Sequence, residues 1–107
     1  MRRLLNYIKK RLLMKKIVLD GNKMTTIEQA HLYIKEQLDL PEYYGNNLDA
    51  LWDILSVEST RKSIMLINRD SLVNNIGAYA NCLINVFLEA SKINTNITFC
   101  VEEYLGK

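Results

Sequence analysis

Short apolar runs alternate along the chain with longer stretches of helical periodicity. The runs at residues 16–19, 64–67 and 97–101 are apolar, and the first, which is β-branched, stops at the turn-forming pair Asp20-Gly21. Apolar runs of this length, bounded by turn signals, are typical of buried strands. The pattern therefore predicts three short strands separated by helical segments.

The interval after the first strand has helical spacing. Thr25 or Thr26 is the expected N-cap, with Glu28 or Gln29 as its capping-box partner, and the helix should end before Leu40-Pro41. The apolar positions that recur at helical spacing are Ile27, Ala30, Leu32, Ile34 and Leu38.

Two further helices are predicted. One begins after a loop rich in turn formers, with Asn46 or Asn47 as its N-cap, and a longer one covers residues 77–92. Residues 68–75 form a polar segment before the longer helix, and Asn74-Asn75 and residues 94–96 are interpreted as caps and turns. The apolar positions are Leu48, Leu51, Trp52 and Leu55 in the first of these helices and Leu83, Val86, Phe87 and Ala90 in the second.

Alternation of strands and helices favours a parallel sheet, because parallel strands need crossover connections. The predicted fold is α/β, with a three-stranded parallel sheet packed with about four helices. The chain has 107 residues, 49% of them hydrophobic, which suffices for one core but not for two domains. Since this architecture hosts unrelated functions, the function has to be argued from a site.

Residues 1–13 differ in composition from the rest. They contain five basic and no acidic residues, with apolar side chains at helical spacing at Leu4, Leu5, Ile8 and Leu12. They are interpreted as a basic extension that is either an amphipathic helix able to touch anionic lipid or a partner, or not translated at all, with Met14 as the start. The predicted domain covers residues 14–107.

The formal net charge of +2 hides an acidic body. Residues 1–13 hold five of the 14 basic residues and none of the 12 acidic ones, so residues 14–107 carry nine basic and 12 acidic residues and a net charge of −3. A nucleic-acid-binding domain would carry its basic patch in the folded body. Direct binding of nucleic acid is therefore not expected, and neither a membrane span nor a signal peptide is recognisable.

Enzyme and metal-site signals are weak. Cys82 and Cys100 lack C-x-x-C spacing and His31 is the only histidine, which disfavours zinc. We expect two buried, free thiols in a reducing cytosol, and a His31 that is partly buried or on a helix surface. No glycine-rich phosphate loop or nucleophile motif is present, so neither catalysis nor a cofactor is expected.

Acidic residues dominate residues 36–60, which contain no Lys or Arg. Asp49 and Asp53 are four residues apart and share a helix face, where like charges cost a few tenths of a kcal/mol. The helix dipole favours an acid at Asp49 but not at Asp53, which lies beyond the first turn. Nearby Tyr43, Tyr44 and Trp52 give the segment the composition of a protein-binding surface, although a solvated acidic face and core aromatic residues remain alternatives.

Residues 40–53, LPEYYGNNLDALWD, closely resemble the loop and second helix of the barstar family. Residues 15–21 resemble the first strand and turn of that family, and residues 86–90 resemble its last helix, so the resemblance spans about residues 15–101. A fourteen-residue block with proline, glycine, tryptophan and paired aspartates in register is a specific signal.

The resemblance implies a cytoplasmic inhibitor, monomeric when free, that enters the active site of a secreted barnase-type ribonuclease in a 1:1 complex. It implies that Asp53 occupies the phosphate site of the enzyme, that Asp49 faces neighbouring basic residues and that Tyr43 packs near the catalytic histidine. The further contact residues that it implies are Gly45, Asn47, Trp52 and Glu89.

Several positions depart from the best-known pattern of the family. Asn46 stands in place of an acid, and Leu88 in place of a basic residue. Glu58 stands at about the place of an exposed tryptophan, and Arg61 and Lys62 follow it. These positions are interpreted as the rim of the interface. They leave open an immunity protein of the same scaffold against a different toxin nuclease, and the basic extension leaves open a membrane- or RNA-associated adaptor.

Overall fold

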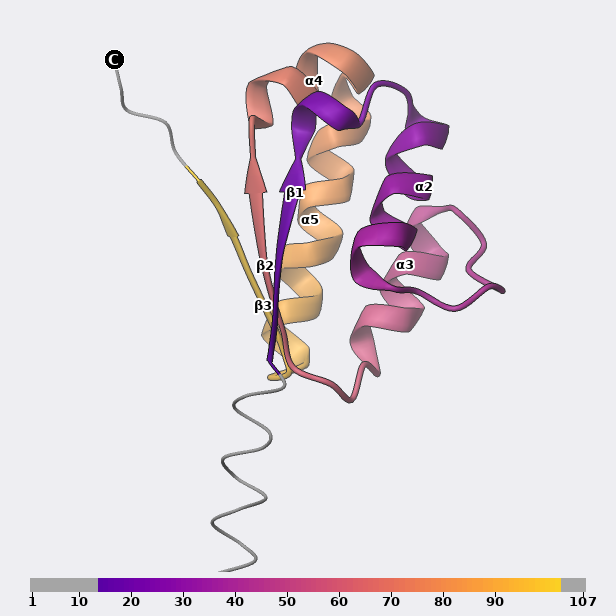
Figure 1. Cartoon of the computed structure of the whole chain (residues 1–107), viewed down its shortest axis with the longest axis vertical. Helices are drawn as coiled ribbons and strands as arrows, with labels where there is room; N and C mark the ends of the chain where they lie inside the picture. The colour runs from indigo at the N-terminus through magenta and orange to yellow at the C-terminus, as the bar shows by residue number, and fades with distance from the viewer. Residues whose placement is uncertain (1–13, 103–107) are drawn as a thin grey trace, which may run out of the picture.

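The computed structural model describes residues 14–102, so the predicted basic extension lies outside the described residues. Strands and helices alternate along the chain, as the hydrophobic pattern predicts (Figure 1). The elements, in order, are β1 (Lys15–Asp20), the 3-10 helix η1 (Gly21–Lys23), α2 (Ile27–Leu38), α3 (Leu48–Ser56), β2 (Lys62–Ile67), α4 (Arg69–Ile76), α5 (Ala78–Ile93) and β3 (Ile97–Val101).

The three strands form one parallel sheet in the order β1-β2-β3. The central strand β2 is in register with both neighbours, so that Ile64 lies between Ile17 and Phe99. The described helices lie to one side of this sheet (Figure 1). The prediction of an α/β fold with a three-stranded parallel sheet and about four helices is confirmed.

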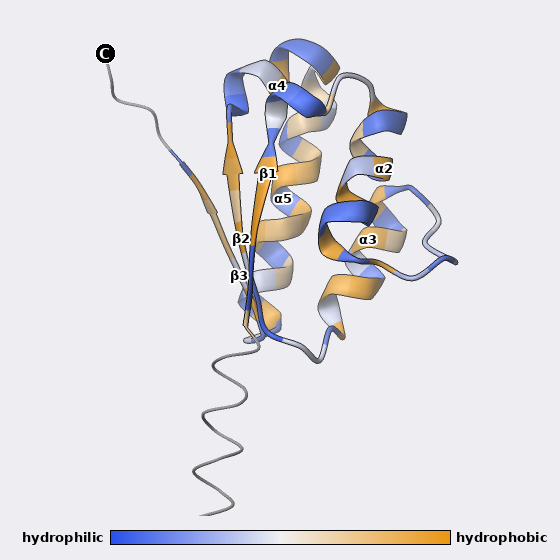
Figure 2. Ribbon diagram, viewed as in Figure 1, coloured by the Kyte–Doolittle hydropathy of each residue, from blue (hydrophilic) through white to orange (hydrophobic). Residues whose placement is uncertain are grey.

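Side chains alternate strictly between the two faces of the sheet. Ile17 and Leu19 of β1 are buried toward the helices, whereas Val18 between them is 47% exposed. Strands β2 and β3 continue this alternation. Figure 2 shows the apolar residues of the sheet and of the facing helices in orange. The hydrophobic core therefore lies between the sheet and the helices.

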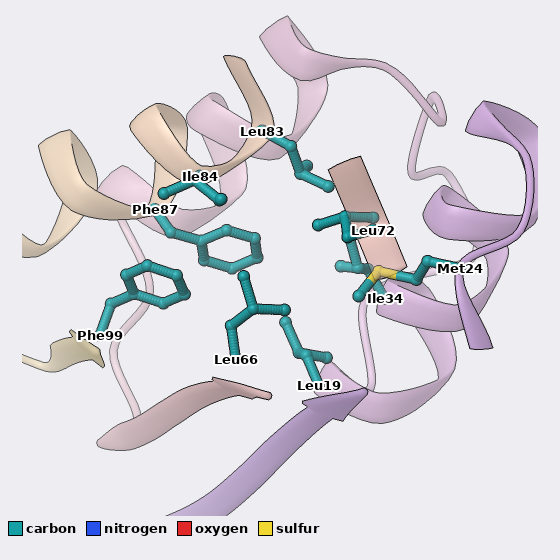
Figure 3. A pocket seen from close by; sticks show the side chains of 9 residues that line it. All are labelled: Leu19, Met24, Ile34, Leu66, Leu72, Leu83, Ile84, Phe87 and Phe99. Atoms are coloured by element: carbon teal, nitrogen blue, oxygen red, sulfur yellow. The ribbon is translucent and has the colours of Figure 1, made fainter. Parts of the chain in front are cut away.

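Side chains from the sheet and from helices α2, α4 and α5 meet at the centre of this core (Figure 3). The gap that they leave is only ≈ 10 Å³ in volume and is lined entirely by apolar groups, so it offers water no polar partner. The lining residues are Leu19, Met24, Ile34, Leu66, Leu72, Leu83, Ile84, Phe87 and Phe99. The core is close-packed, and its scaffold is rigid.

The sequence indicates two N-cap candidates for each of two helices, and the structure decides between them. The side chain of Thr26 accepts a hydrogen bond from the backbone N–H of Gln29 at 3.0 Å, which makes Thr26 the N-cap of α2. Asn47 accepts from the N–H of Ala50 at 2.8 Å and caps α3, whereas Asn46 takes a left-handed conformation with φ 56°. Both caps are of the predicted kind.

The interpretation of residues 74–75 as caps and turns is wrong, because both lie in helix α4 (Arg69–Ile76). This helix follows Asn68 without a side-chain cap, and its apolar side is short: Leu72 is fully buried, and Val73 and Ile76 are partly buried against the core. Asn75 donates from Nδ2 to the backbone oxygens of Gly21 and Met24, at 3.4 and 3.1 Å. Tertiary hydrogen bonds and this short apolar side together hold the segment.

The expected burial of both thiols is also wrong, since Cys82 and Cys100 are free but exposed. Cys100 points to the face of the sheet that the described helices leave uncovered, and Cys82 lies on a side of α5 that remains open to solvent. His31, expected at or near a surface, is fully buried. In each case the exposure of the side chain depends on which neighbouring element covers it. Periodicity alone does not show this.

Candidate protein-binding site

The loop before α3 is held in a defined shape. Asp39 ends α2 in a left-handed conformation, with φ 55°, and the N–H of Leu40 donates to the backbone oxygen of Lys35 at 2.9 Å. The N–H of Tyr44 closes a turn onto the oxygen of Pro41 at 3.0 Å. At its far end, Asn47 donates from Nδ2 to the oxygen of Gly45 at 3.1 Å. Binding of a partner would therefore cost little additional conformational entropy in this loop.

The two adjacent tyrosines of this loop have opposite roles. Tyr43 is 83% exposed, whereas Tyr44 is 5% exposed and belongs to the core. The Tyr44 hydroxyl lies 2.6 Å from Nδ1 of His31, and Nε2 of His31 lies 2.7 Å from the hydroxyl of Tyr79 at the start of α5. The buried His31 thus connects the loop, α2 and α5. The neighbouring Tyr43 is exposed and can contact a partner.

In these two hydrogen bonds a neutral His31 ring donates to one tyrosine hydroxyl and accepts from the other. If the ring were protonated, the donating tyrosine would have to become an acceptor. A neutral ring donates from one nitrogen and accepts at the other, whereas the imidazolium donates from both. Burial lowers the pKa of His31 from its ordinary 6.5, and burial also raises the pKa of Tyr44, with a further contribution from Tyr79. Neutral His31 and protonated tyrosines are therefore the stable state of the network.

This network makes stability depend on pH. Because the pKa of His31 is lower in the folded chain than in the unfolded chain, stability is fully present above about pH 6.5 and falls as pH drops below that value. We expect the free energy of unfolding, measured by urea titration from about pH 8 to about pH 5, to fall in the parent and to stay nearly level in His31→Gln. A parent protein that loses no stability over this range would contradict the assignment.

The two aspartates of α3 are unneutralised. Asp49 and Asp53 are both exposed, and among residues 14–102 neither forms an ion pair or a side-chain hydrogen bond. Asp49 lies in the first turn of α3, where the helix dipole favours it, and Asp53 lies one turn further along the same face. Two fixed carboxylates without a cationic neighbour form a site that is complementary to a cationic partner.

Helices α3 and α5 border an open groove of ≈ 480 Å³ beside these aspartates. Its lining residues are Leu48, Asp49, Trp52, Cys82, Asn85, Val86 and Glu89. The groove brings together three predicted site residues that are as much as 40 positions apart in the sequence: Asp49, Trp52 and Glu89. Val86, which the periodicity assigned to the core, is half-buried in its wall.

Four groove residues were not predicted as site residues: Leu48 and Val86 were assigned to apolar helix faces, and Cys82 and Asn85 to no site at all. Cys82 and Asn85 carry no motif, and only the packing of α5 beside α3 places them there. The other predicted residues lie on the loop and on α3 but do not line the groove; they are Tyr43, Gly45, Asn47 and Asp53.

Asn47 has less freedom to contact a partner than the resemblance implies. Its side-chain oxygen caps α3 and its amide group binds Gly45, so both ends of the side chain are used within the protein. Gly45 does not need a positive φ, and a Cβ atom there would meet Ala50 and Asn47 at an ordinary 3.4 Å. The backbone of this position does not by itself demand glycine.

Glu58 and Lys62, interpreted from sequence as rim positions, form a largely buried ion pair instead. Nζ of Lys62 lies 2.9 Å from Oε1 of Glu58 and 2.9 Å from the backbone oxygen of Leu38. Burial alone would raise the pKa of Glu58, but hydrogen bonds from Lys62 and Thr60 outweigh it and hold the pKa at about 2. These two side chains hold β2 to the end of α2, whereas Arg61 remains exposed.

The described residues show neither a metal site nor a membrane span. Within residues 14–102 there is no group of three or more His, Cys, Asp or Glu side chains that could hold a metal ion. No helix in this part of the chain is both long enough and apolar enough to cross a bilayer.

Comparison with known proteins identifies relatives of the chain. The family model described as "Barstar (barnase inhibitor)" matches residues 14–102. A Bacillus subtilis (strain 168) protein named "Putative ribonuclease inhibitor YrdF" is 38% identical over 80 residues, which cover 74% of this chain and 88% of that protein.

Proposed function

The chain belongs to the barstar family, and we propose that it is an intracellular inhibitor that blocks the active site of a secreted barnase-type ribonuclease in a 1:1 complex, without catalysis or a cofactor. The observation that carries this proposal is the pair of unneutralised carboxylates, Asp49 and Asp53, exposed on one face of a rigidly capped helix. Free carboxylates in a fixed array suit an active site that is built of cations.

The inhibitor acts as a phosphate mimic. A ribonuclease binds the RNA backbone with Arg, Lys and His side chains, and a carboxylate accepts charge-assisted hydrogen bonds from the same donors. Asp53 takes the place of the phosphate, and Asp49 faces adjacent basic residues. The exposed ring of Tyr43 packs over the catalytic centre and covers it, so that RNA is excluded both by charge and by bulk.

The groove between α3 and α5 extends this contact surface. Glu89, which lines it, supplies a third carboxylate, and among residues 14–102 this carboxylate pairs with the exposed Lys92 alone, at 3.0 Å. Trp52 in the groove wall is half-buried and packs against the core, so its ring is held in place for a partner. Aromatic anchors between charged residues are typical of interface hot spots.

The direct test is inhibition of a barnase-type ribonuclease by the purified protein at two ionic strengths. We expect RNA cleavage to be lost at one inhibitor per enzyme, and the association rate to fall by about tenfold or more as salt rises from about 0.05 M to about 0.5 M, since opposite fields steer the encounter. Full cleavage in the presence of excess inhibitor would overturn the proposed target.

One observation keeps a second target in view. Leu88, which precedes Glu89, is 40% exposed and stands where the family pattern has a basic residue. This exposed apolar position next to Glu89 suits an enzyme surface different from that of barnase. Inhibition of another toxin nuclease, but not of a barnase-type enzyme, would assign the chain as an immunity protein on the same scaffold.

A further inference from the structure

The proposed contact surface consists of two parts that belong to different elements. Residues 39–47 connect α2 to α3 and carry the exposed Tyr43, and we call this segment the binding loop (Figure 1). The groove lies between α3 and α5, with Glu89 in its α5 wall. A partner gains the full affinity of both parts only if the loop keeps a fixed position relative to α5, because a loop that must first be ordered costs free energy on binding.

We propose that His31 and Tyr79 are positioning residues that fix the binding loop relative to α5, so that Tyr43 and the groove meet the same partner. This inference rests on the proposed function and deepens it. Neither His31 nor Tyr79 is among the partner-binding residues that the sequence predicts. Both act through the position of the loop.

The connection consists of two short hydrogen bonds through one buried ring. Nδ1 of His31 lies 2.6 Å from the hydroxyl of Tyr44 in the binding loop, and Nε2 lies 2.7 Å from the hydroxyl of Tyr79 at the start of α5. Each tyrosine ring centroid lies 5.8 Å from that of His31. Because His31 is fully buried in α2, a movement of the loop away from it would leave a ring nitrogen without a partner and without water.

Tyr79 lies on the side of α5 that faces the groove. It is followed at helical spacing by Cys82, Val86 and Glu89, and these three residues line the groove. Burial, with a smaller contribution from the neighbouring Cys82, raises the pKa of Tyr79, so its hydroxyl keeps its proton at neutral pH. One side of α5 therefore forms the wall of the groove and, one turn earlier, anchors the binding loop.

The variant Tyr79→Phe tests this connection, because it keeps the ring and removes only the hydroxyl that pairs with His31. It leaves Nε2 without that partner, whereas every buried side-chain nitrogen and oxygen among residues 14–102 has a partner in the parent. The matched control is Tyr33→Phe. It removes a part-buried hydroxyl of α2 that accepts from the backbone N–H of Asp20 at 3.0 Å, at the end of β1 rather than in the binding loop.

The first measurement is hydrogen exchange in the free proteins, which needs no ribonuclease. The N–H of Tyr44 donates to the backbone oxygen of Pro41 at 3.0 Å and reports whether the loop is closed. It should exchange about tenfold faster in Tyr79→Phe than in the parent, because a loop without its anchor opens more often. In Tyr33→Phe its rate should stay within about twofold of the parent rate, since that hydroxyl does not hold the loop.

The second measurement is affinity for a barnase-type ribonuclease. Tyr79→Phe should bind about tenfold more weakly than the parent, because affinity falls with the fraction of molecules whose loop is in place. In a Tyr43→Ala background the same substitution should cost less than about threefold, since the loop has lost the contact that depends on its position. Tyr33→Phe should cost less than about threefold in both backgrounds.

The outcomes separate this inference from the proposed function. Unchanged exchange at Tyr44 in Tyr79→Phe, or equal losses of affinity with and without the Tyr43 ring, would overturn the positioning role. A parent that inhibits no ribonuclease would overturn the proposed function instead, and the exchange rates would still decide whether Tyr79 holds the binding loop.

Discussion

Replacing Asp53 by Ala should weaken inhibition of the cognate ribonuclease by roughly a hundredfold or more, the loss expected when one partner of a desolvated ion pair is removed. The cations of the enzyme would stay buried in the interface without their carboxylate. The free inhibitor should fold as before, because Asp53 is exposed and makes no side-chain contact that holds the fold. Titration of RNA cleavage at constant ionic strength gives both affinities.

Two variants show whether the affinity depends on the position of this charge and on the charge itself. Glu36→Ala removes the same charge from the exposed side of α2 and should change affinity less than about threefold, since exposed charges away from an interface act mainly through the screened field. Asp53→Asn keeps the shape of the side chain and should still lose most of the affinity. If Asp53→Ala inhibits as well as the parent, Asp53 does not occupy the phosphate site.

The fold was predictable because its signals are local. Each strand shows a short apolar run and each long helix an apolar stripe, and in α2 and α3 that stripe begins after a side-chain cap. The choice between Thr25 and Thr26 was not predictable, since both have the same hydroxyl and only the backbone geometry selects one. Helix α4 was missed because it has no side-chain cap, fully buries only Leu72, and depends in part on hydrogen bonds from Asn75 to a distant turn.

The candidate site likewise has one part that local sequence signals predicted and one part that they did not. The aspartates and the exposed tyrosine lie in one continuous segment, so composition and resemblance were enough to point to them. The groove needs α3 and α5 side by side, and Asn85 and Cys82 carry no local signal of it. His31 contacts Tyr44 and Tyr79, which are 13 and 48 residues away, so the sequence alone did not reveal its burial.

Replacing Glu58 by Gln should lower the free energy of unfolding by about 3 kcal/mol, because the largely buried ammonium of Lys62 would lose its opposite charge and keep only neutral oxygen acceptors, such as the backbone oxygen of Leu38. The pKa of Glu58 is about 2 in the folded chain and 4.5 ordinarily, so its stabilisation is present above about pH 4.5 and is lost as pH falls toward 2. The variant should lack this step of acid destabilisation.

Urea unfolding at several pH values measures both effects. As a control, Glu42→Gln breaks the exposed pair with Lys35 and should lower the free energy of unfolding by less than about 0.5 kcal/mol. Unchanged stability with weaker inhibition in Glu58→Gln would return Glu58 to the rim of the interface; lower stability with inhibition retained at neutral pH would establish that it holds β2 to α2.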